Sequence, residues 1–174
     1  MTNKSTIFST LSEARECIST ATLDSAFENS IVVLLQTLDT ESVWEIVNQL
    51  LTHPKANARA LGLRVVLRQF KDKELLERVI QLCFAVGRLA ELQYWYTAIL
   101  ARYPVMHFLR KLEAEAANRK DADFIACHIR ALQMHKADGN RAKKMALTKL
   151  MAFASSADWA PGHCQQTDMD GTAR

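Results

Sequence analysis

The stretch GRLAELQYWYTAILARYP, residues 87–104, decides the fold that the sequence predicts. It begins with a glycine, ends with a proline and keeps a helical apolar spacing between them. Tyr94, Trp95 and Tyr96 lie about 100° apart around such a helix, so they cannot all face one core. A helix that is apolar on more than one side needs neighbours on two sides. We therefore expect this helix to stand inside a stack of helices.

Two apolar faces follow from the helical register of this stretch. The first face is formed by Leu89, Leu92, Tyr96, Ile99, Leu100 and Tyr103, and the second by Ala90, Tyr94, Ala98 and Ala101. We expect Leu92, Tyr96 and Ile99 to lie in the core. If Tyr94 or Trp95 is exposed instead, its large amphipathic ring would serve as an anchor for a partner.

Helix-breaking and helix-capping residues recur along the whole chain at intervals of 15 to 18 residues. They fall near Thr22–Asp24, Asp39–Thr40, His53–Pro54, Lys71–Asp72, Gly87, Pro104, Lys120–Asp121 and Asp138–Gly139. Each interval holds one helix of three to four turns, and the predicted N-cap residues are Asp24, Thr40, Asp72, Asp121 and Asp138. Two intervals together give a period of about 33 residues, which is typical of repeated helical hairpins.

This pattern predicts an all-α fold. The expected architecture is a right-handed stack of antiparallel helical hairpins, an α-solenoid of eight or nine helices. We expect a single α-helical repeat domain over residues 1–155. Residues 156–174 lose the apolar period and are expected to form a disordered or loosely packed tail.

Two stretches resemble known families of helical repeats. The opening stretch resembles the second helix of a tetratricopeptide repeat, matching it at Gly87, Leu89, Tyr96 and Pro104. The stretch HPKANARALGLRVVLRQF, residues 53–70, is similar to a HEAT repeat helix, matching it at Pro54, Arg59, Gly62, Val66 and Leu67. These resemblances imply a binding scaffold that holds peptides, helices or other proteins in a concave groove.

No motif in the sequence indicates catalysis or a cofactor. There is no nucleophile elbow, no HExxH, no phosphate-binding glycine loop and no dinucleotide fingerprint. His128 and His135 stand seven residues apart, about 10 Å along a helix, which is too far to share a metal without other ligands. We therefore expect a protein that is not an enzyme and that holds no cofactor or metal.

Cysteine usage and apolar run length predict the compartment. The four cysteines form no CxxC pair, and the first twenty residues carry no run typical of a signal peptide. The longest apolar run, IVVLL at residues 31–35, is too short to span a membrane. We expect a cytoplasmic protein with reduced cysteines and no membrane partner.

Charge is distributed unevenly along the chain and bears on partners. Residues 1–52 carry a net charge of −5, and residues 53–174 carry +8. Arg64, Arg68 and Lys71 share one helix face, with Arg59 nearby, and a solvated face is the usual reading of such a cluster. The alternative is a HEAT-like surface for nucleic acid.

The predicted function is a protein-interaction module, an adaptor or a chaperone that holds a helical or extended client. The first helices of the expected hairpins are 40–53, 72–86 and 105–119. Their outward positions form a mildly basic polar row of Asn48, Arg78, Gln81, His107, Arg110 and Lys111, with Tyr94 or Trp95 as an apolar anchor. The expected client is another protein or peptide that offers an acidic or helical segment, and the sequence leaves the oligomeric state open.

Overall fold

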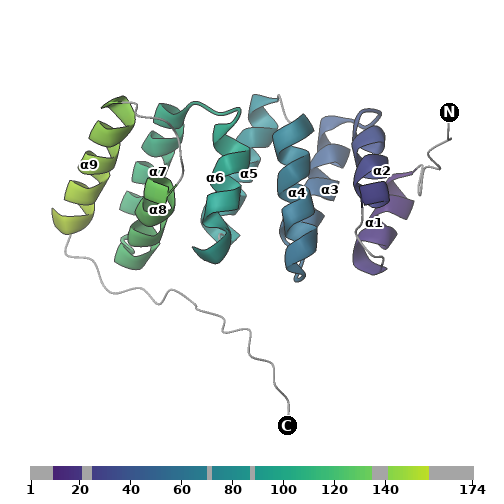
Figure 1. Cartoon of the computed structure of the whole chain (residues 1–174), viewed down its shortest axis with the longest axis horizontal. Coiled ribbons are helices and arrows are strands. Elements are labelled where there is room, and N and C mark those ends of the chain that lie inside the picture. The colour runs from purple at the N-terminus through teal and green to yellow at the C-terminus, as the bar shows by residue number, and fades with distance from the viewer. Residues whose placement is uncertain (1–9, 21–24, 70–71, 87–88, 135–140, 157–174) are drawn as a thin grey trace, which may run out of the picture. The chain divides into compact units, whose positions relative to one another are not determined.

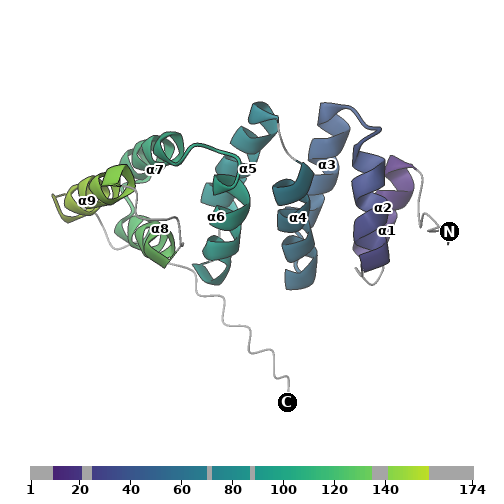
Figure 2. The same ribbon diagram turned by 45° about the horizontal axis from the view of Figure 1, so that its top comes forward.

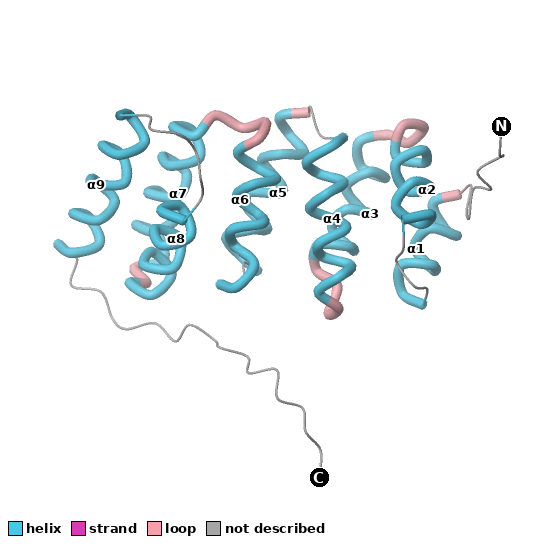
Figure 3. Tube along the Cα trace, in the orientation of Figure 1, coloured by secondary structure: helices cyan, strands magenta, loops and turns pink. Residues whose placement is uncertain are grey.

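The computed structural model describes residues 10–20, 25–69, 72–86, 89–134 and 141–156. Within these residues the chain forms nine α-helices and one short 3₁₀ helix, with no strand (Figures 1 and 3). The elements are α1 (Leu11–Thr20), α2 (Ser25–Leu35), α3 (Thr40–Leu51), α4 (Ala56–Gln69), α5 (Lys73–Val86), the 3₁₀ helix η1 (Leu89–Glu91), α6 (Leu92–Leu100), α7 (Val105–Arg119), α8 (Ala122–Met134) and α9 (Arg141–Ser156). The all-α prediction is confirmed.

Capping side chains begin several of these helices. Asp72 accepts a hydrogen bond from the backbone N–H of Glu74 at 2.7 Å, and Asp121 accepts one from Phe124 at 3.0 Å, as the sequence predicts. The prediction of Thr40 as an N-cap is wrong by one residue. Asp39 caps α3 instead, because its carboxylate accepts from the backbone N–H groups of Glu41 and Ser42, both at 3.0 Å. The hydrogen bond from the backbone of Ser42, more than any other contact, holds the pKa of Asp39 below its ordinary value.

The predicted breaks coincide with helix ends wherever the structure describes them. Pro104 stands immediately before α7, and Lys120 follows the last residue of that helix with a left-handed φ of 53°. Such a φ is uncommon for a residue with a side chain and here it ends the helix. The predicted breaks and caps at Asp24, Lys71, Gly87, Asp138 and Gly139 lie outside the described residues.

The helices divide into two compact units, Met1–Pro104 and Val105–Arg174. The evenly spaced breaks of the sequence do not indicate a division at residue 104, and they predict one domain over 1–155. Of the predicted tail, residues 156–174, Ser156 is the last residue of α9, and residues 157–174 lie outside the described residues. None of the helices in the described part of the chain is long and apolar enough to cross a lipid bilayer.

In the first unit, sequence neighbours and alternate helices pack against each other. Helix α3 packs on α4 and α5 packs on α6, as Figures 1 and 2 show. Alternate helices also meet: α1 packs on α3, α2 on α4, and α4 on α6. Helices α3, α4 and α6 therefore each pack against more than one neighbouring helix.

Helices α3 and α4 approach each other closely at Gly62. A methyl group built at this glycine would lie 3.0 Å from Cβ of Leu50 and 3.0 Å from Cδ2 of Leu51. Leu50 and Leu51 are both fully buried, so the missing side chain of Gly62 is what lets the two helices pack this closely.

Helix α6 shows how three adjacent aromatic residues are accommodated. Trp95 is 1% exposed and Tyr96 is fully buried, whereas Tyr94 is 66% exposed. Leu92 and Ile99 are buried as predicted. The second buried side of the helix is formed by Trp95 together with Ala98, not by the predicted set that includes Tyr94. Two of the three rings are buried because α6 packs against both α4 and α5.

The second unit has a core of its own in which α7 and α8 both pack on α9. A histidine, His128 of α8, lies inside this unit and is 2% exposed. Its ring centroid is 4.2 Å from that of Phe124, and the guanidinium of Arg119 lies 4.5 Å from the Phe124 ring. Burial, together with the positive charge of Arg119, lowers the pKa of His128 to about 3.

We expect this buried histidine to make the second unit sensitive to acid. The unfolded chain binds a proton at His128 below about pH 6.5, whereas the folded chain keeps the ring neutral until about pH 3. The contribution of the neutral His128 ring to the stability of the fold is therefore complete above about pH 6.5. It declines as the pH falls from there toward about pH 3. We expect a loss of about 2 kcal/mol of unfolding free energy between pH 7 and pH 5, measured by denaturant melts followed by circular dichroism.

The variant His128→Gln should weaken this pH dependence, because its side chain does not titrate. His107→Gln is the matched control, since His107 is exposed on α7 of the same unit. Equal pH dependence in the His128→Gln variant and the unaltered protein would contradict this explanation.

Candidate functional site

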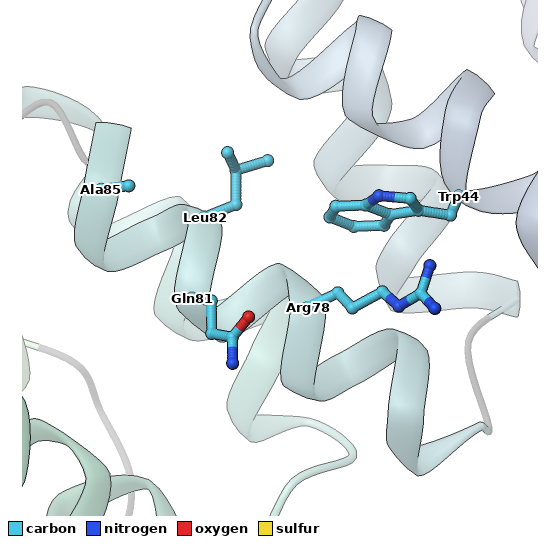
Figure 4. Close-up of a pocket in the computed structure, with 5 residues that line it drawn as sticks. All are labelled: Trp44, Arg78, Gln81, Leu82 and Ala85. Carbon is cyan, nitrogen blue, oxygen red and sulfur yellow. The ribbon is translucent and has the colours of Figure 1, made fainter.

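A shallow, open depression of about 390 Å³ lies between α3 and α5 of the first unit (Figure 4). Trp44 of α3 forms one wall. The other wall is formed by Arg78, Gln81, Leu82 and Ala85 of α5. Arg78, the adjacent pair Gln81 and Leu82, and Ala85 follow one another at intervals of three or four residues, so the helical period brings them to one side of α5. The depression offers aromatic, aliphatic, amide and guanidinium groups on one surface.

Arg78 is held by two carboxylates at the edge of this depression. Its guanidinium donates two hydrogen bonds to Glu41, at 2.8 and 2.6 Å, and one to Glu74 at 3.0 Å. It also lies 5.9 Å from the centroid of the Trp44 ring, within range of a cation–π contact. The hydrogen bonds to Glu41 raise the pKa of Arg78 above its ordinary value. One positive charge is thus shared between two negative ones.

The predicted site residues do not all belong to this surface. Arg78 and Gln81 line the depression, whereas His107, Arg110 and Lys111 lie on α7 in the second unit. Arg110 and Lys111 lie three and four residues after His107, one turn along that helix, and the side chains of His107 and Arg110 are exposed. Asn48 is half-buried on α3.

The prediction of an aromatic anchor is corrected for Trp95. This residue is a core side chain, because α6 turns it toward its neighbours in the first unit. Tyr94 is exposed on the same helix but does not line the depression. The aromatic residue that does line it is Trp44.

Trp44 was not predicted as a site residue, although the sequence carries a signal for it. The buried residues of α3 are Val43, Ile46, Val47, Leu50 and Leu51. Trp44 follows the first of them directly and falls beside this stripe, where it is half-buried. A large aromatic residue next to the core stripe of an amphipathic helix is a candidate for a surface contact.

The basic residues of α4 are engaged by carboxylates. Arg64 donates to Glu28 at 2.9 Å, and Arg68 donates to the other carboxylate oxygen at 2.6 Å. Both arginines are about half-exposed, in keeping with the predicted solvated face. Lys71 lies outside the described residues.

Arg59 departs from the solvated-face prediction, because its side chain is 4% exposed. It donates to both carboxylate oxygens of Glu91 in η1, and also to the backbone carbonyls of His53 and Pro54 at 2.6 Å. The hydrogen bonds that Arg59 donates to Glu91 raise the pKa of Arg59. This arginine joins the loop before α4 to the segment that leads into α6.

Among the described residues no group of three histidine, cysteine, aspartate or glutamate side chains is placed to hold a metal ion. Cys83 of α5 is fully buried, and burial raises the pKa of its thiol. The thiol is therefore protonated and shielded from solvent.

No protein-family model, no curated protein and no solved structure matches this chain. The function must therefore be inferred from the depression on α3 and α5 and from its surroundings.

Proposed function

We propose that the protein is a non-enzymatic interaction module, an adaptor or a chaperone, that binds another protein on the surface formed by α3 and α5. Its helices are proposed to stack as right-handed antiparallel hairpins in an α-solenoid. The packing in the first unit supports this arrangement, since alternate helices meet as successive hairpins of a solenoid would.

The observation that carries the proposal is the pairing of Trp44 with Arg78 beside an open depression. Tryptophan and arginine are among the residues that contribute most to binding energy at protein interfaces. Here the indole is half-buried, and Arg78 is fixed by Glu41 and Glu74. Because these side chains are already ordered, less conformational entropy is lost when a partner binds them than when it binds a mobile surface.

The nucleic-acid alternative receives less support from the first unit. Phosphate binding needs cations that are free to contact the backbone of the nucleic acid. Arg59, Arg64 and Arg68 instead donate to Glu91 and Glu28 within the chain. Protein binding is therefore the function we propose.

Site-specific photo-crosslinking tests this proposal. A photoreactive amino acid placed at Gln81, which is exposed in the depression, is expected to capture a defined polypeptide in cells that produce the protein. The same amino acid at Thr97 is the control, because Thr97 is exposed on α6 and does not line the depression. The captured polypeptide is identified by mass spectrometry.

The adduct at Gln81 should disappear when Trp44→Ala is introduced together with the photoreactive residue. Circular dichroism must show that this variant keeps its helical content. Capture of the same proteins from Gln81 and Thr97, or no capture from Gln81, would contradict the proposed binding surface.

A further inference from the structure

We propose that the surface of α1, α3 and α5 binds a basic segment of another protein, whose lysine or arginine side chains meet the carboxylates around the depression while an aliphatic side chain enters it. This inference rests on the proposed function and specifies the chemistry of the partner. It differs from the acidic partner that the sequence predicts.

Charge is partitioned between the odd-numbered and even-numbered helices of the first unit. The odd-numbered helices α1, α3 and α5 carry six carboxylates and three cations, namely Glu13, Glu16, Glu41, Glu45, Glu74 and Glu77 against Arg15, Lys73 and Arg78. The even-numbered helices, with η1, carry two carboxylates and three arginines, and all five of these side chains are joined in ion pairs. The excess of negative charge therefore belongs to the odd-numbered helices.

The helical register brings part of this negative charge to the depression itself. Glu41 lies three residues before Trp44 and four before Glu45 on α3, so its side chain is a neighbour of both on the helix surface. On α5, Glu74 lies one turn before Arg78 and accepts a hydrogen bond from it, and Arg78 in turn lines the depression. Glu41 and Glu74 thus both contact Arg78 at the edge of the depression.

The cations at this surface are fewer than its carboxylates. Arg78 is shared by Glu41 and Glu74, whose side chains are 67% and 68% exposed. Arg15 pairs with Glu45, which is 50% exposed. One guanidinium between two carboxylates leaves a net negative charge, and the exposed oxygens can accept hydrogen bonds from a further cation.

The apolar part of the depression selects for a second feature of the partner. Figure 4 shows Leu82 and the Trp44 ring bordering the same space between α3 and α5, with Ala85 one turn further along α5. Ala85 leaves room above its small side chain. A leucine, isoleucine or methionine flanked by lysines or arginines would bury its side chain there and place its cations near Glu41, Glu45 and Glu74.

The probe for the test is a fluorescein-labelled amphipathic peptide of leucine and lysine in helical spacing. Its reference is the same peptide with glutamate in place of every lysine. Binding to the full chain is measured by fluorescence anisotropy at low and at physiological salt. We expect the lysine peptide to bind more tightly than the glutamate peptide, with an affinity that falls as salt rises.

The variant Glu41→Gln/Glu74→Gln should weaken binding of the lysine peptide about 10-fold, since each exposed ion pair contributes modestly. The control is Glu113→Gln/Glu115→Gln on α7, which changes the net charge by the same amount and also breaks an ion pair, that of Glu115 with Arg119. This control should leave the affinity nearly unchanged.

Three results would overturn the inference. They are tighter binding of the glutamate peptide, equal weakening by the two double variants, and a dimer in sedimentation experiments that the change at Glu41 and Glu74 dissociates. The last result would show that a second copy of the chain covers this surface. If Gln81 crosslinks to an acidic or uncharged segment, the proposed interaction function stands while the basic partner is rejected.

Discussion

Replacing Glu91 with alanine is expected to lower the free energy of unfolding by about 3–5 kcal/mol, because it leaves a buried guanidinium without its counterion. Arg59 is almost completely shielded from water, and Glu91 accepts hydrogen bonds from both its Nε and Nη2 atoms. The carbonyls of His53 and Pro54 remain, but they carry no formal charge. Denaturant unfolding followed by tryptophan fluorescence measures the loss.

Glu45→Ala is the control for this experiment. Its partner Arg15 is 54% exposed, and water screens the pair. Exposed ion pairs typically contribute about 0–1 kcal/mol, so we expect a loss within that range. Similar losses for Glu91→Ala and Glu45→Ala would show that water reaches the Arg59–Glu91 pair and screens it, which would contradict this explanation.

Trp95→Ala should lower the free energy of unfolding by about 3–5 kcal/mol, because it removes one of the largest fully buried side chains and leaves a cavity. The neighbouring variant Tyr94→Ala provides a control on the same turn of the same helix. With 66% of its surface exposed, Tyr94 should contribute about 0.5 kcal/mol or less. Far-UV circular dichroism measures both variants without depending on the tryptophan signal.

The order of these two losses tests the rotation of α6 about its axis. A greater loss for Tyr94→Ala than for Trp95→Ala would mean that the helix is turned by about 100° from the orientation described above.

Local information in the sequence was sufficient to predict most of the helices. Asp72 and Asp121 each combine a capping side chain with an apolar stripe that starts within the next turn. At Asp39–Thr40 two capping residues stand side by side, and only the backbone geometry decides between them. Periodicity alone could not decide which of three adjacent aromatics stays exposed, because that depends on where α4 and α5 pack against α6.

The candidate site was only partly predictable for a related reason. Arg78 and Gln81 follow from the outward face of a predicted helix, but the wall opposite them, Trp44, comes from α3. The sequence shows a basic residue at position 78, but it does not show that Glu41 of α3 accepts hydrogen bonds from this arginine. The burial of Arg59 was not predicted either, because its counterion Glu91 lies 32 residues further along the chain.

The contact between Arg59 and Glu91 also bears on the order in which the chain can assemble as it is synthesised. Arg59 leaves the ribosome 32 residues ahead of its counterion. Until Glu91 follows, burial of the guanidinium is opposed by the cost of removing an unpaired charge from water. We therefore expect the first turns of α4 to remain hydrated on the nascent chain and to reach their final packing only when the segment leading into α6 has emerged.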